Sequence, residues 1–254
     1  MKESPPDLHT PIYLKLSEDM PWPPDAVFHL LSRDGLFRCR NHPFFRSSVE
    51  SADFPSELAG HAPFVSLSYP KLSQKLFETV VGYFSEVADL HGAEAAVLLV
   101  WNRLRGEVEV VVPEQRSVVS ISWFSGTVSP LNVHYEIPPL AAHQVPIGDV
   151  HSHVDGAAYA SGTDVDDELH RPGLHIVVGR ISREPPEFHV EVTVDGGRFA
   201  VENIRKVVEG YAQRRCEEVP EEWMGKLQVE QWKNQYWSAA STATASGYDD
   251  QESH

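Results

Sequence analysis

The feature that most constrains this chain is a pair of histidines directly after an apolar run. Residues 145–150 read VPIGDV, which is typical of a β-strand, and His151 and His153 follow. Because side chains alternate across a strand, both imidazoles are expected on the same face, where they can reach one ion. Asp164 can return from the following loop as a hard oxygen ligand. Three such ligands are typical of a catalytic zinc site, whose fourth position is left to water.

The spacing of these residues resembles the motif of a known family. His151, His153, Ser161 and Asp164 form the pattern H-x-H-x7-S-x2-D without insertion. This is the motif of the JAB metalloprotease superfamily, also called JAMM or MPN, and the chain is similar to its prokaryotic Mov34/MPN/PAD-1-like members from operons of ubiquitin-like proteins. In that family an upstream glutamate opens a strand just after the first long helix, and Glu94 stands at this place.

The resemblance implies a role for each residue of the motif. The two histidines and the aspartate would hold Zn²⁺. Glu94 would move a proton from the attacking water to the leaving amine, and Ser161 would donate a hydrogen bond to the oxyanion. Glu107 and Glu109, which share one face of another predicted strand, remain alternatives to Glu94 as the base. Ser161 and Asp164 also fit a capping box at the start of a short helix, and the two roles are compatible.

The family also implies a substrate. Its members hydrolyse the isopeptide or peptide bond after the C-terminal glycine of ubiquitin or a ubiquitin-like protein. We therefore expect a zinc-dependent, deubiquitinase-like isopeptidase that acts on a ubiquitin-like protein or its conjugates, with E1-like and E2-like operon products as further partners. The alternatives are a non-enzymatic MPN-type scaffold in a multi-protein assembly, and a JAB branch associated with DNA repair. A homodimer is left open.

Composition narrows the partners and the compartment. The formal net charge of −16 argues against nucleic acid as a partner, because binding to phosphates depends on lysine and arginine. Two cysteines, Cys39 and Cys216, do not form a disulfide framework and favour a reducing compartment. The longest apolar run, AAVLLVW at residues 95–101, has the length of a strand, so no membrane span is expected. The sequence thus predicts a cytoplasmic protein.

The chain is expected to contain three parts. Residues 1–70, rich in proline and turn residues, predict a small α+β extension with strands near 11–16 and 36–40 and a short helix near 25–31. Residues 71–215 would form the JAB/JAMM metalloprotease domain. Residues 216–254 would form a C-terminal segment that is disordered after about residue 237, where large apolar residues are scarce.

The predicted domain has the α/β class of the JAB/MPN fold, a mixed, cytidine-deaminase-like sheet flanked by helices. Its apolar spacing predicts a helix over residues 72–90, which Ser73 could cap, and a second long helix over residues 202–219. A short helix is expected from Asp164. The predicted strands cover residues 95–101, 107–113, 117–124, 132–139, 143–150, 174–181, 188–194 and 197–204. The run at 174–181 is almost wholly apolar, which predicts a place in the middle of the sheet.

Overall fold

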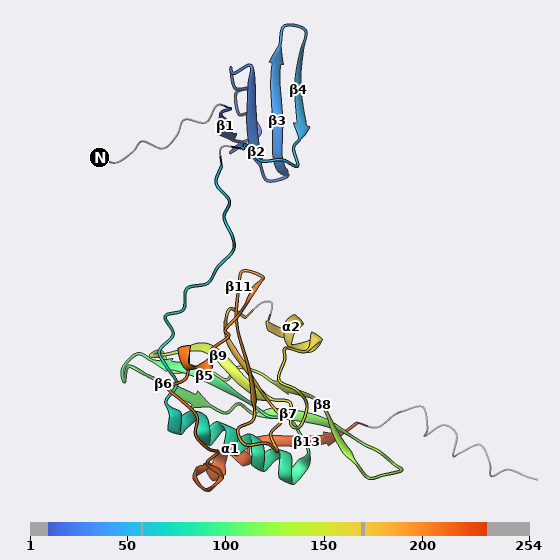
Figure 1. Cartoon of the computed structure of the whole chain (residues 1–254), viewed down its shortest axis with the longest axis vertical. Helices are drawn as coiled ribbons and strands as arrows, with labels where there is room; N and C mark the ends of the chain where they lie inside the picture. The colour runs from blue at the N-terminus through green and yellow to red at the C-terminus, as the bar shows by residue number, and fades with distance from the viewer. Residues whose placement is uncertain (1–9, 57, 169–170, 233–254) are drawn as a thin grey trace, which may run out of the picture. The chain divides into compact units, whose positions relative to one another are not determined.

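A computed structural model describes residues 10–56, 58–168 and 171–232 of the chain (Figure 1). The chain divides into two compact units, Met1–Pro63 and Phe64–His254. The disorder predicted after about residue 237 lies outside the described residues. Within these residues, no helix has both the length and the apolar character that a membrane crossing requires.

The first unit is a four-stranded sheet whose strands are ordered as in the sequence. These are β1 (Ile12–Leu14), β2 (Val27–Ser32), β3 (Gly35–His42) and β4 (Phe45–Glu50). The β1 strand runs parallel to β2, and the other neighbours are antiparallel. Phe28 and Cys39 are fully buried, and the Trp22 ring packs edge-on against Phe28 at 5.3 Å between centroids. This unit therefore has a small core of its own.

The two strands predicted in the first unit are confirmed as β1 and β3, but the predicted helix at 25–31 is wrong. That segment forms β2, in which Phe28 and Leu30 point to the core. Such a period of two belongs to a strand. A tight turn ending at Gly35, whose φ is +138°, returns the chain at once as β3. Hairpin pairing thus outweighs the weak helical preference of the segment.

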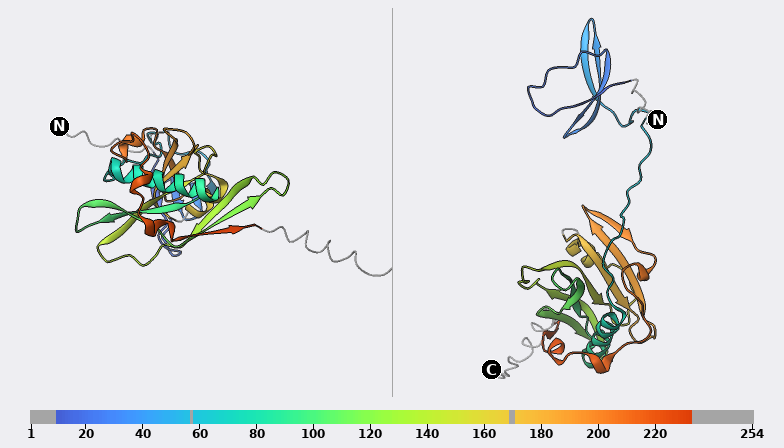
Figure 2. Two further views of the ribbon diagram at one scale, coloured as in Figure 1. Left: turned by 90° about the horizontal axis from the view of Figure 1, so that it is seen from below. Right: turned by 90° about the vertical axis from the view of Figure 1, so that its left-hand side faces the viewer.

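The second unit begins with the long helix that the sequence predicts. Helix α1 spans Gln74–His91, and the Ser73 side chain caps it by accepting a hydrogen bond from the backbone N–H of Leu76 at 3.3 Å. Gly92 ends it in the left-handed conformation, which favours glycine. Figure 2 shows α1 running along one side of this unit.

A six-stranded mixed sheet forms the centre of the second unit, in the order β12-β11-β10-β9-β5-β6. The predicted α/β class is confirmed, and the run at 174–181 forms an inner strand, β10.

The elements after α1 are β5 (Ala96–Asn102), β6 (Glu107–Val111), β7 (Gln115–Ile121), β8 (Val128–Tyr135), β9 (Gln144–Ser152), α2 (Gly162–Glu168), β10 (Gly173–Gly179), β11 (Glu187–Val194), β12 (Gly197–Ala200), α3 (Glu221–Met224) and β13 (Leu227–Gln231).

The two faces of this sheet differ in chemistry. On β9 and β10, Val150 and Ile176 are fully buried and belong to the hydrophobic core that includes the buried side of α1. Because neighbouring side chains alternate, Asp149, His151 and His175 point to the opposite face. Strands β9 and β10 are parallel, and Asp149 pairs with His175 across them. One face of the sheet is therefore apolar, and the other has a buried polar cluster.

A second, three-stranded sheet has the order β13-β7-β8. The sequence predicted the strands that form β7 and β8, but it did not predict β13, which pairs in parallel with β7 from Leu227 to Gln231. Strand β8 lies at one edge of this sheet.

The prediction of a long helix over residues 202–219 is wrong, because backbone N–H groups of this segment donate to a side chain of α1. The segment has only two short 3-10 turns, Ile204–Lys206 and Cys216–Glu218. Between them, the backbone N–H groups of Ala212 and Gln213 donate to Oε1 of Glu78, which is fully buried on α1. The side chain of Arg215 donates to the other carboxylate oxygen. Donors that a continuous helix would use internally are thus bound to Glu78.

Replacing this buried carboxylate should destabilise the second unit. In Glu78→Gln, Oε1 can still accept from the backbone, but the ion pair with Arg215 is lost, which should cost about 2 kcal/mol of unfolding free energy. Burial alone would raise the pKa of Glu78, but the hydrogen bonds outweigh it and hold this pKa below its usual value. A group with a depressed folded pKa stabilises above its unfolded pKa and loses that effect as the pH falls. Urea titrations should therefore show a difference from wild type at pH 7 that shrinks in acid.

The control for this experiment is Asp89→Asn, an exposed acid on the same helix. We expect it to change the unfolding free energy by less than about 0.5 kcal/mol. A Glu78→Gln protein as stable as the wild type at neutral pH would show that the bonds to residues 212–215 do not hold the segment.

Candidate functional site

The two histidines of the motif meet Asp164 at the end of β9. His151 lies within β9 and His153 directly after it, and their ring centroids are 5.2 Å apart. Asp164 is in the first turn of α2 and directs one oxygen to each ring: Oδ1 is 3.5 Å from Nε2 of His151, and Oδ2 is 3.5 Å from Nε2 of His153. The three side chains offer ligand atoms that all lie within 4.8 Å of one another.

Local hydrogen bonds orient two of these side chains. Nδ1 of His153 is 3.1 Å from the carbonyl oxygen of Ala157, so this nitrogen can donate there and leave Nε2 to the cluster. At the start of α2, the backbone N–H of Ser161 donates to Oδ2 of Asp164 at 2.7 Å, and the N–H of Asp164 donates to Oγ of Ser161 at 3.3 Å. This is the reciprocal capping box that the sequence suggested. The Ser161 hydroxyl only accepts in it, so its proton is available to a ligand.

The donor set fits a metal ion. Nε2 of His151 is buried and has no hydrogen-bond partner among the described residues. An orphaned buried nitrogen is costly unless a proton partner or a cation satisfies it. Two imidazoles and a carboxylate are ligands that zinc prefers, and they leave a fourth position open. The two histidines also hold the pKa of Asp164 well below its usual value, although burial alone would raise it.

Glu94 lies beside this cluster because the start of β5 is fixed to the end of β9. The backbone N–H of Ser152 donates to the carbonyl of Ala95, and the N–H of Ala95 donates to Oγ of Ser152 at 3.2 Å. Glu94 and both histidines line the same cavity. Burial raises the pKa of the Glu94 carboxyl, and the nearby histidines offset this only in part. A carboxylate with a raised pKa suits proton transfer near neutral pH.

The two alternative glutamates lie elsewhere. Both are on β6, which is separated from β9 by β5 in the sheet, and neither lines the cavity of the histidines. Oε1 of Glu109 accepts a hydrogen bond from Asn102 at 2.7 Å, and Oε2 accepts one from Gln144 at 2.9 Å. Glu107 is exposed and lies 3.7 Å from Arg105. The structure thus places Glu94, and not Glu107 or Glu109, with the motif residues.

Backbone contacts position the loop after His153. Gly179 ends β10, and a Cβ atom there would lie 2.4 Å from the backbone nitrogen of Ala158. The loop therefore packs directly on the main chain of β10, which only glycine permits. Val154 has a φ of +49°, a strained conformation for a β-branched residue. This close approach and this turn bring the loop back over the end of the sheet.

The cavity around the histidines has a volume of about 400 Å³. One wall is β8, and Tyr159 stands edge-on to His153 with 5.3 Å between ring centroids. The remaining lining residues come from β8, from the loop after His153 and from α2, namely Pro130, Leu131, Asn132, Val133, Gly156, Ala157, Thr163 and Asp167. An edge strand, a cluster of side chains that could hold a metal ion and a carboxylate thus share one cleft.

The sequence did not predict a second cluster of polar side chains, which lies beside the cluster of the two histidines and Asp164. Asp149, Glu168 and His175 are almost fully buried and offer ligand-type atoms within 4.8 Å of one another. Asp149 precedes His151 by two residues, which places both side chains on one face of β9. This spacing of two residues could have indicated that Asp149 lies near His151. Its contacts with Glu168 and His175 could not be predicted in this way, because these residues lie on other elements.

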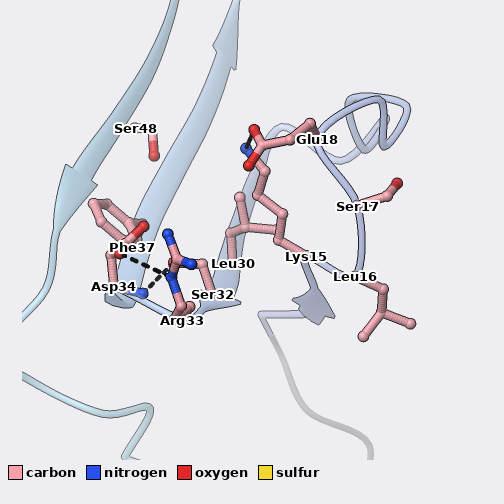
Figure 3. A pocket seen from close by; sticks show the side chains of 10 residues that line it. All are labelled: Lys15, Leu16, Ser17, Glu18, Leu30, Ser32, Arg33, Asp34, Phe37 and Ser48. Atoms are coloured by element: carbon pink, nitrogen blue, oxygen red, sulfur yellow. Dashed lines mark hydrogen bonds and ion pairs between the residues drawn. The ribbon is translucent and has the colours of Figure 1, made fainter.

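A cavity of about 540 Å³ in the first unit lacks comparable features (Figure 3). Its charged residues pair with each other: Lys15 lies 3.7 Å from Glu18, and Arg33 lies 3.7 Å from Asp34. Leu16 points away from both pairs in Figure 3. Within the described part of the chain, none of the buried polar atoms that lack a partner lines this cavity. We assign no ligand to it.

Comparison with solved structures shows only weak likenesses. The chain is similar to a JAB1/MPN domain protein from Archaeoglobus fulgidus, with 20% identity, coverage of 54% of this chain and 96% of the other, and a TM-score of 0.33. A protein from Desulfitobacterium hafniense is 15% identical over 58% and 96% of the two chains, with a TM-score of 0.35. One from Salinibacter ruber is 15% identical over 58% and 94%, with a TM-score of 0.28. Scores this low establish no relationship.

The family comparison is more informative. No curated protein sequence matches the chain significantly. Residues 84–192, however, match the family model of prokaryotic homologs of the JAB domain. This segment runs from the second half of α1 into β11 and contains the histidines, Asp164, Ser161 and Glu94. The cluster at the end of β9 therefore lies inside the segment of this chain that is similar to prokaryotic homologs of the JAB domain.

Proposed function

We propose that this protein is a zinc-dependent isopeptidase that releases a ubiquitin-like protein after its C-terminal glycine. The JAB/MPN superfamily includes both metallopeptidases and inactive scaffolds. The observation that favours an enzyme is the convergence of His151, His153 and Asp164, with Nε2 of His151 buried and without a hydrogen bond among the described residues. A scaffold has no need of such a donor set, since an unsatisfied buried nitrogen costs stability.

The residues of this chain divide the chemistry among them. Zinc held by the two histidines and Asp164 would supply an acidified water and a polarised carbonyl. Glu94 accepts the water's proton on its carboxylate and returns it to the leaving amine nitrogen. The Ser161 hydroxyl, which only accepts in the capping box, donates its proton in a hydrogen bond to the developing oxyanion. Nothing in this scheme requires a covalent acyl intermediate.

Strand β8 could pair with the extended C-terminal tail of a substrate. It is an edge strand of its sheet, and its residues from Pro130 to Val133 line the cleft beside the histidines. A peptide that adds to such an edge gains backbone hydrogen bonds and makes few side-chain demands. This suits a glycine-ended tail, which offers little side chain to recognise. E1-like and E2-like proteins are partners that such an activity would have.

Metal dependence is the first test. Purified protein should contain close to one zinc ion per chain, and a strong chelator should abolish cleavage of a ubiquitin-like protein fused through its C-terminal glycine. Added Zn²⁺ should restore the cleavage. His153→Ala should lose both the metal and the activity, because it removes one of three protein ligands. A wild-type chain that binds no zinc and cleaves no such fusion would instead support the scaffold alternative.

Loss of the base should separate metal binding from catalysis. Glu94→Gln keeps the shape of the side chain but cannot accept a proton, so kcat should fall by about 100- to 10,000-fold. Zinc content, measured by atomic absorption, should stay at the wild-type level, because Glu94 is not needed as a ligand.

The matched control is Glu109→Gln, a carboxylate-to-amide change outside the cleft, which should leave kcat within about twofold, as expected of a site away from the chemistry. Cleavage by Glu94→Gln at the wild-type rate would remove Glu94 from the mechanism. A large loss in Glu109→Gln would reinstate the β6 alternative.

A further inference from the structure

Asp149 stands at the centre of a buried polar network behind the histidines. Its side chain is only 3% exposed. Oδ2 accepts hydrogen bonds from the hydroxyl of Tyr135 and from Nδ1 of His175, each at 3.1 Å. Oδ1 faces Nδ1 of His151 at 4.0 Å. One carboxylate thus contacts β10 and the edge strand β8, and it faces a ligand histidine on its own strand.

The same network reaches the helix that carries Asp164. Nδ1 of His175 is 3.5 Å from Oε1 of Glu168, the last residue of α2. Oε2 of Glu168 lies 2.8 Å from Nη2 of Arg198 on β12. Since Asp164 occupies the first turn of α2, the network is anchored at both elements that hold the ligands.

Charge is balanced within this network. Asp149 has Arg171 at 3.6 Å, and Glu168 has Arg198. Two buried carboxylates without cations would be very costly, whereas these are each paired. Although Asp149, Glu168 and His175 could reach a common ion, the arginines already compensate them, so a second metal is not needed. The network is better suited to hold its neighbours in place.

We propose that Asp149 is a positioning residue that sets the tautomer of His151. A neutral imidazole carries one N–H, and a carboxylate facing Nδ1 favours the proton there. Nε2, which faces Asp164, is then free to bind a cation. Asp149 also contacts His175, which lies next to Glu168 of α2. These contacts fix the position of the His151 ring relative to α2. The inference rests on the proposed metal site and adds a residue to it.

Replacing Asp149 by asparagine should reverse this preference. Tyr135 and His175 both donate to the same oxygen of Asp149, Oδ2. An asparagine amide has only one acceptor oxygen, so this oxygen must take the place of Oδ2. The amide NH₂ then faces Nδ1 of His151 in place of a carboxylate oxygen, and this reversal of charge favours the tautomer that carries the imidazole proton on Nε2. Zinc affinity of Asp149→Asn should fall by about 10- to 100-fold, as is typical when such outer partners of a ligand are lost.

The affinity is measured directly, by competition of the folded protein with a chromophoric chelator for Zn²⁺. The absorption bands of the Co²⁺-loaded protein report the ligand geometry independently of activity, and they should shift in Asp149→Asn. The matched control is Glu78→Gln, which also neutralises a buried carboxylate of the second unit but lies on α1, against the opposite face of the sheet. Its Zn²⁺ affinity and Co²⁺ spectrum should equal those of the wild type.

The outcomes separate this inference from the function on which it rests. A folded Asp149→Asn protein with wild-type Zn²⁺ affinity and Co²⁺ spectrum would overturn the role of Asp149 and leave the isopeptidase proposal intact. A wild-type chain without zinc would refute both. If Asp149→Asn does not fold, nitrogen-15 NMR of histidines in the zinc-loaded wild type decides: a proton on Nδ1 of His151 supports the inference, and Nδ1 bound to the metal overturns it.

Discussion

The alternation of side chains across β9 is the constraint on which the rest of the second unit depends. Val150 points into the core that includes α1, whereas Asp149 and His151 point to the other face. The apolar side stabilises the sheet through burial, and the polar side is kept in place by partners from neighbouring elements. A shift of register by one residue would put the imidazole into the core. Folding and site assembly therefore depend on the same pairing of strands.

Regular elements with a clear period could be predicted from sequence alone. The capped helix from residue 74 and the apolar strand at 174–181 have spacings that no distant contact overrides. The predictions failed where a distant group decides the backbone. The segment at 202–219 has helical spacing, yet Glu78 on α1 binds its N–H groups. Segment 25–31 reads ambiguously until the hairpin with β3 fixes it as a strand.

In the candidate site, too, local features could be predicted from sequence, whereas features that depend on distant contacts could not. The positions of His151, His153 and Asp164 in the sequence were enough to propose a shared ion, because a strand end and a following helix cap fix them locally. The choice of Glu94 over the glutamates of β6 required the pairing of β5 with β9. The role of Asp149 was not visible, since its contacts Tyr135 and His175 come from β8 and β10, and sequence spacing does not report such cross-strand contacts.

The contact at Gly179 has a consequence for how this domain could diversify. The loop after His153 contacts β10 at Gly179 through the main-chain atoms of Ala157 and Ala158, so this one contact does not depend on the side chains at those two positions. Substitutions at Ala157 can alter the surface of the loop while its carbonyl oxygen still contacts Nδ1 of His153. The side chains of this loop can therefore change without rearranging the histidine cluster, provided that position 179 stays glycine.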